Sequence, residues 1–206
     1  MATPPRLVPL LEQFDFARER LTGRLAGPLM DSGNGVGIGV TPLGDDEYFW
    51  EPVPGCWSVR RREAGPGPRA TVLEGSGDRG RDSAASPHPF PPPFTTIAWR
   101  LSHLSEMLAL RADHTNGSRS LTRARLAVPG NAAGAVAAFV SAAEAWHATL
   151  LTADDTALDT VGYSAYPYGS DAEDLFVDIV WWVNQEILHH GAEIALIRDL
   201  YRARQP

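Results

Sequence analysis

The chain contains no lysine, a single cysteine and no long apolar run, and each absence excludes a class of protein. Without a second cysteine, Cys56 cannot form an internal disulfide, and a zinc finger built on cysteine ligands is excluded. No apolar run reaches the roughly 18 residues that a membrane span requires. The N-terminal residues also lack an apolar signal-peptide core and an Ala-x-Ala cleavage site. We therefore expect a cytoplasmic protein with no membrane partner.

All 18 cationic residues are arginines, and 25 acidic residues outnumber them, so the net charge is −7. A negatively charged chain binds phosphates poorly, and we expect no nucleic-acid partner. Arginine also stands where a solvated lysine would serve equally well, which indicates a GC-rich genome of actinobacterial type. With 206 residues, 44% of them hydrophobic, the chain is predicted to fold as one domain, 1–206.

Four stretches repeat apolar residues at helical spacing, three and four positions apart, with charged residues between them. They are the stretch from Leu7 to the glycines at 23 and 27, then 95–113, 131–152 and 171–203. A shorter helix is expected over 45–50, and no stretch shows the alternation of a strand. The predicted fold class is therefore all-α, a four-helix bundle.

Polar residues at the expected helix starts support these boundaries. Thr95 or Thr96 can cap the second long helix, Asn131 the third and Asp171 the fourth, because their side-chain oxygens accept free backbone N–H groups. The alanine-rich third helix could also form the seam of a homodimer.

Two segments between the helices are rich in glycine. Residues 61–94 combine glycine with proline, serine and arginine, and they predict a long, irregular, protease-sensitive loop between the first and second core helices. Residues 33–39 contain alternate glycines but no following strand–helix unit and no Lys-Ser/Thr pair. A flexible connection fits 33–39 better than a phosphate-binding loop.

The histidines differ in what their positions indicate. His88 in the proline-rich segment, His114 past a helix end and His147 on the alanine-rich helix are predicted to lie on the surface. His103 lies mid-helix within one turn of Trp99, near the inward face. Alone, such a histidine is more often a satisfied core residue than a ligand.

Glu186 and His190 are four positions apart in the fourth helix, which places them one turn apart on one face. Their neighbours Val183, Ile187 and Ile194 belong to the apolar stripe, so both polar groups face inward or lie at its edge. A buried carboxylate beside a buried imidazole is costly unless the two pair with each other or bind a metal.

His103 is the inward histidine that a facing helix could add to Glu186 and His190. Two imidazoles and one carboxylate make a three-ligand site for a divalent metal, with positions left open for water or substrate. We expect zinc, with nickel or iron as alternatives. A hydrogen bond between Glu186 and His190 on a half-exposed face is the competing interpretation of the spacing.

Two further residues bear on this hypothesis. His189 points about 100° away from His190 and either orients a ligand or lies on the surface. Cys56 could compete as a nucleophile, but it lies in an apolar turn with no histidine nearby in sequence, and we predict a buried, inert thiol.

The segments Trp99–His103 and Asn184–Ile194 resemble the DinB-like superfamily of metal-binding four-helix bundles, the group that includes bacillithiol-transferase-like proteins. The superfamily's usual pattern is one histidine on the second helix and His-x-x-x-His on the last. Here Glu186 replaces the first histidine of that pair, and this variant resembles the mycothiol-dependent maleylpyruvate isomerase branch. The segments Glu47–Pro52 and Cys56–Arg60 are also similar to actinobacterial members.

The resemblance implies that His103, Glu186 and His190 are the metal ligands. It further implies a thiol S-transferase or thiol-dependent isomerase, whose partners are a small-molecule thiol, with mycothiol as co-substrate in an actinobacterial host, and an electrophile. Two other functions remain open at this point. They are a metal-dependent hydrolase and a non-catalytic bundle that binds a metal, ligand or partner.

Overall fold

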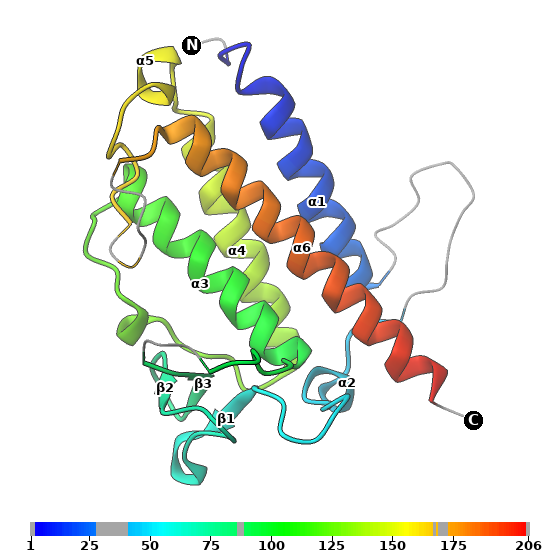
Figure 1. Cartoon of the computed structure of the whole chain (residues 1–206). Coiled ribbons are helices and arrows are strands. Elements are labelled where there is room, and N and C mark those ends of the chain that lie inside the picture. Colours follow the sequence, from blue (N-terminus) through cyan, green and yellow to red (C-terminus); the bar gives the residue numbers. More distant parts are fainter. Residues whose placement is uncertain (1–2, 28–40, 86–88, 167, 169–172, 205–206) are drawn as a thin grey trace, which may run out of the picture.

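The computed structural model describes residues 3–27, 41–85, 89–166, 168 and 173–204. Four long helices run side by side along the body of the molecule (Figure 1). They are α1 (Val8–Ala26), α3 (Ile97–Asn116), α4 (Ala132–Leu150) and α6 (Phe176–Ala203). Two short helices, α2 (Asp45–Tyr48) and α5 (Asp155–Leu158), lie in the connections. The predicted helical bundle is confirmed, while its extent as one domain stays a prediction.

The apolar stripes of the sequence form the core of the bundle. Phe14 and Leu21 of α1 are at most 2% exposed, as are Leu101 and Leu108 of α3. In α6 the apolar positions of the stripe are equally buried: Phe176, Ile179, Val180, Val183, Ile187, Ile194 and Ile197. The helices form because burying these stripes against one another removes apolar surface from water.

Two of the predicted helix caps are present. The Thr96 hydroxyl accepts the backbone N–H of Trp99 at 3.2 Å, and the Asn131 side chain accepts that of Gly134 at 2.7 Å. Each bond satisfies one of the free N–H groups at a helix start, which fixes where α3 and α4 begin.

The predicted start of the fourth helix is wrong. α6 begins at Phe176, and its N-cap residue is Leu175 rather than Asp171, which lies outside the described residues. Leu175 has an extended backbone and forms an antiparallel bridge with Val161, so the helix begins after it. The glycine-rich residues 33–39 also lie outside the described residues.

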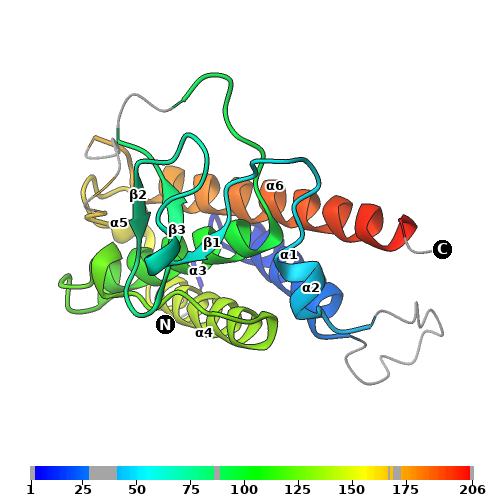
Figure 2. The ribbon, with the colours of Figure 1, turned by 90° about the horizontal axis from the view of Figure 1, so that it is seen from below.

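The expectation of an irregular loop over 61–94 is wrong for part of that segment. Three antiparallel strands form a small sheet in the order β1-β3-β2. The strands are β1 (Val59–Arg61), β2 (Val72–Glu74) and β3 (Arg79–Ser83), with a 3₁₀ turn, η1 (Arg62–Ala64), after β1. Seen from below, this sheet and α2 lie across one end of the bundle (Figure 2).

Polar contacts hold the sheet together and dock it onto the bundle. Asp82 of β3 is fully buried and accepts the N–H groups of Ser58 and Gly67 and a hydrogen bond from Arg60 at 2.7 Å. The indole N–H of Trp99 donates to the Asp82 carbonyl at 2.8 Å. The sheet is therefore anchored to α3 one turn before His103.

No helix in the described part of the chain is both long enough and apolar enough to cross a membrane.

Candidate metal centre

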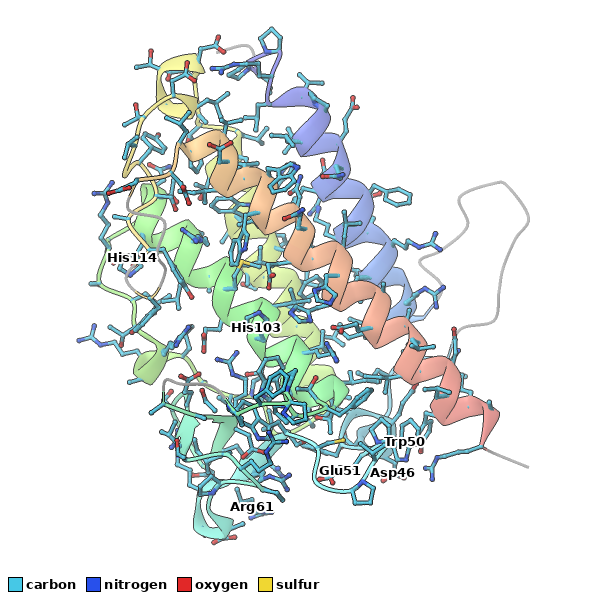
Figure 3. The ribbon with its side chains drawn as sticks, viewed as in Figure 1. Asp46, Trp50, Glu51, Arg61, His103 and His114 are labelled. Atoms are coloured by element: carbon cyan, nitrogen blue, oxygen red, sulfur yellow. The ribbon has the colours of Figure 1, made fainter. Side chains whose placement is uncertain are left out.

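Two helices bring the three predicted ligands together. α3 presents His103, and α6 presents Glu186 and His190 one turn apart. The Glu186 Oε2 atom lies 3.2 Å from His103 Nε2 and 3.4 Å from His190 Nε2. Figure 3 places His103 in the lower half of α3, on which α6 packs.

The three side chains form a compact donor set. One ligand atom from each lies within 4.8 Å of the others, and the exposed fractions of the side chains are 24% for His103, 21% for Glu186 and 12% for His190. The cluster is thus partly buried yet reachable from solvent. Two imidazole nitrogens and one carboxylate oxygen suit zinc and other divalent transition metals.

The surroundings of His103 and Glu186 favour the ligating form of these two groups. Burial lowers the pKa of His103 to about 4, so its imidazole is neutral at neutral pH. A hydrogen bond from His103 is the main cause that holds the pKa of Glu186 well below its usual range, so its carboxylate is charged. Metal ligation requires a neutral imidazole and an ionised carboxylate, and both are present here.

A second ring of side chains surrounds His190. Its Nδ1 atom lies 2.7 Å from Glu193 Oε2 and 3.0 Å from Arg100 Nη1. Glu193 also forms an ion pair with Arg100 and lies 3.2 Å from His189 Nε2. Sequence reasoning missed the roles of Glu193 and Arg100, although the spacing of Glu193, three positions after His190, was a signal for the former.

His189 lies at the surface, and its ring also contacts two side chains near the cluster. Its side chain is 62% exposed, yet it stacks on His190 with ring centres 4.9 Å apart and contacts Glu193. On α3, the indole of Trp99 stacks on His103 with ring centres 5.3 Å apart. Both predicted histidine ligands are therefore flanked by flat rings that limit their rotation.

A cavity of about 550 Å³ adjoins the cluster through His103. Its wall carries aliphatic, aromatic, cationic and acidic side chains from α3, α6 and the intervening segments. These are Met107, Arg111, Arg123, Tyr166, Asp174, Asp178, Ile179, Trp181 and Trp182. A small organic molecule could lie here within reach of the cluster.

The other histidines follow the predictions only in part. His114 was expected on the surface, but it lies inside α3, is 7% exposed and contacts the Leu121 carbonyl at 2.8 Å. The prediction fails because α3 continues past 113 to Asn116. His147 is half-buried and lies 3.4 Å from Asp15, and His88 is outside the described residues.

Cys56 is buried, as predicted. Its side chain is fully enclosed, its thiol donates to the Val53 carbonyl at 2.9 Å, and burial raises the thiol pKa. A raised pKa disfavours the reactive thiolate. The cysteine thus has the surroundings of a structural residue.

Comparison with known proteins agrees with the fold and the cluster. The family model of the DinB superfamily matches residues 39–194, which is more than half of the chain. The chain belongs to the DinB superfamily. The matched region contains α3 and most of α6, and with them His103, Glu186 and His190. DinB proteins bind divalent metals, and the cluster supplies a donor set for one. No curated protein and no solved structure matches the chain.

Proposed function

We propose that this DinB protein is a metal-dependent thiol S-transferase or thiol-dependent isomerase. The single observation that carries the proposal is the convergence of His103, Glu186 and His190 within 4.8 Å beside a cavity. In this proposal the three residues hold zinc, with nickel or iron as alternatives, and leave coordination positions open.

The charge of the donor set favours an anionic co-ligand. Two neutral imidazoles and one carboxylate leave Zn²⁺ with a net charge of +1, which a single thiolate neutralises. A neutral complex costs less in the partly buried mouth of a bundle than a charged one. The metal, when bound, would lower the pKa of a coordinated thiol and so supply a nucleophile at neutral pH.

The chain's own residues would position the reactants. The cavity next to His103 is offered as the site of the electrophile, because its apolar and aromatic wall includes Met107, Tyr166 and Trp182. Enclosing the reactants beside the cluster excludes water, which would otherwise compete with the thiol for the electrophile.

We propose mycothiol as the thiol, on two sequence features. Glu186 in place of histidine resembles the mycothiol-dependent isomerase branch, and the absence of lysine suits an actinobacterial host. The reaction is placed in the cytoplasm, where small thiols are kept reduced.

The test combines metal content with thiol consumption. Purified wild-type protein is analysed for metal. It is then incubated with mycothiol and a panel of small electrophiles and assayed both for loss of thiol and for thiol-dependent conversion of the electrophile. Glu186→Gln removes the negative ligand charge, so its metal affinity and thiol consumption are expected to fall together. Glu12→Gln, an exposed change of the same chemistry on α1, is the matched control and is expected to equal the wild type.

Two outcomes would redirect the proposal. Metal-replete wild type that neither consumes thiol nor converts any electrophile in a thiol-dependent way indicates a non-catalytic binding protein. Turnover of an ester or amide without thiol indicates a hydrolase that uses water instead.

A further inference from the structure

His190 has a carboxylate at each of its two ring nitrogens. Nε2 faces Glu186 Oε2 at 3.4 Å, inside the cluster. Nδ1 faces Glu193 Oε2 at 2.7 Å, outside it. The shorter of the two contacts is thus the one to Glu193, on the side of the ring that faces away from His103 and Glu186.

The Glu193 carboxylate is itself held in place. Arg100 forms an ion pair with it, and only 9% of the Arg100 side chain is exposed. His189 approaches its other oxygen at 3.2 Å. A guanidinium carries only hydrogen-bond donors, so Arg100 attracts the Glu193 carboxylate. This attraction holds Glu193 Oε2 beside His190 Nδ1.

The 2.7 Å contact between Nδ1 and Glu193 favours a proton on Nδ1. A bare Nδ1 would place its lone pair against those of a charged carboxylate oxygen, which is repulsive. A protonated Nδ1 donates to Glu193 at the length of a charge-assisted hydrogen bond. Arg100 Nη1 also lies 3.0 Å from Nδ1, but a guanidinium only donates, and only a proton on Nδ1 makes the 2.7 Å contact with Glu193 attractive. Nδ1–H is therefore the consistent assignment.

We propose that Glu193 is a positioning residue for His190. It accepts the Nδ1–H proton, fixes the ring orientation and leaves Nε2 to face His103 and Glu186. This inference rests on the proposed metal site, for which Nε2 must be the ligating nitrogen. A carboxylate behind a histidine ligand fixes its tautomer and increases the ligand's basicity.

Glu193→Gln tests the role through metal affinity. The amide can donate a proton to Nδ1, which favours the Nε2–H tautomer that cannot ligate. The Kd for Zn²⁺, measured by competition with a chromophoric chelator, is expected to rise about 10- to 100-fold. Asp199→Asn, an exposed change elsewhere on α6, is the matched control and is expected to keep the wild-type Kd.

A second readout follows the proton itself. Nitrogen-15 spectra of the metal-free protein are expected to show His190 protonated on Nδ1 in the wild type and on Nε2 in Glu193→Gln. A purely structural role for Glu193 would change thermal stability without moving this proton. The spectra need no bound metal, so they test the inference even if the wild type binds none.

The outcomes separate the two proposals. Wild-type protein that takes up no Zn²⁺ contradicts the proposed function, whatever the state of His190. Wild type that binds Zn²⁺, with a Kd in Glu193→Gln within twofold of it, overturns the positioning role. A bare Nδ1 in the wild-type spectrum overturns it as well.

Discussion

His103 Nε2 and Glu186 Oε2 lie 3.2 Å apart, and the pKa values of both groups are lowered. Burial makes the His103 imidazole harder to charge, while its hydrogen bond makes the Glu186 carboxylate easier to charge. Both shifts resist protonation. A divalent cation entering the cluster at neutral pH therefore displaces few protons from these two groups.

Cys56 gives a residue-scale prediction about which thiol reacts. Its sulfur is enclosed, donates to Val53 and has a raised pKa. We expect a disulfide reagent to label Cys56 slowly in the native protein and rapidly in guanidinium chloride. Cys56→Ala is expected to keep its metal and any thiol-dependent turnover. Native labelling at the denatured rate, or turnover lost in a folded, metal-loaded Cys56→Ala, would contradict this.

Residue types and spacing predicted the cluster but not its support. His103, Glu186 and His190 could be recognised because helical spacing places each on an inward face. Glu193 and Arg100 could not, since charged residues on helices usually face water and their pairing depends on how α3 and α6 cross. The spacing of residues along a helix shows which of them share a face of that helix. It does not show which residues of two different helices meet, and that is known only from the packed structure.

At the scale of elements, the helices could be predicted from their own sequence, whereas the sheet depends on contacts between distant residues. The long helices were predictable because each buries an apolar stripe, and Thr96 and Asn131 mark two of their starts. The strands have three to five residues, and β3 buries Arg81 and Asp82 rather than apolar side chains. No apolar alternation exists to detect, because buried ion pairs and hydrogen bonds hold this sheet.

The junction between the sheet and α3 gives the next prediction. Arg81 Nη2 lies 2.6 Å from Glu74 and 3.0 Å from Glu106, and Arg123 lies 3.0 Å from Glu106. Glu106→Gln leaves two guanidiniums with one carboxylate, which we expect to cost about 3–5 kcal/mol. Limited proteolysis should leave 59–83 intact in the wild type and cut it in the variant.

Glu63→Gln is the control for this junction. Glu63 pairs with Arg61 at 3.7 Å on the surface, where both side chains are at least 67% exposed, so its loss is expected to change little. Wild type cut within 59–83 as fast as Glu106→Gln would show that the junction does not hold the sheet.

The turn after α3 carries a pH-dependent prediction. Burial raises the pKa of Asp113, but hydrogen bonds from Leu121 and Ser118 outweigh it and hold this pKa below its usual range. The unfolded chain therefore binds the proton first as pH falls. The stabilisation is complete above about pH 4 and is lost as pH falls through the folded-state pKa.

Asp113→Asn should accordingly lower the free energy of unfolding by about 1 kcal/mol at neutral pH. The difference should shrink at pH 3, because the wild type has by then lost part of this stabilisation. Urea unfolding at both pH values measures it, with the exposed change Glu12→Gln as control. A difference that grows with acid would contradict the assignment.

At the scale of the whole molecule, the described bundle presents α4 along one flank, between helices α1 and α3 (Figure 2). Ala132, Ala135, Ala142 and Ala143 of this helix are buried against the core, whereas Ala133, Ala137 and Ala145 are exposed. The homodimer expected through this helix stays a prediction. The exposed alanines are small enough to permit the close approach of a helix from a second copy, but they do not specify an interface.

The proposed metal would also act on the whole fold, since its ligands are far apart in sequence. His103 and Glu186 are 83 positions apart, so an ion held by both joins α3 to α6 and cannot be held in the same way by the unfolded chain. Zn²⁺ at 100 times its Kd should then add about 2.7 kcal/mol to the free energy of unfolding. For a chain of this size the melting temperature rises roughly 2–4 °C per kcal/mol, so a shift of about 5–11 °C is expected.

Thermal melts of chelator-treated protein with and without Zn²⁺ measure this shift. Mg²⁺ is the control ion and should have little effect, because it prefers oxygen ligands to imidazoles. His103→Ala retains only two of the ligands, both on α6, so Zn²⁺ should raise its melting temperature little. An equal rise in the wild type and His103→Ala would place the bound zinc elsewhere, and the link between α3 and α6 would be wrong.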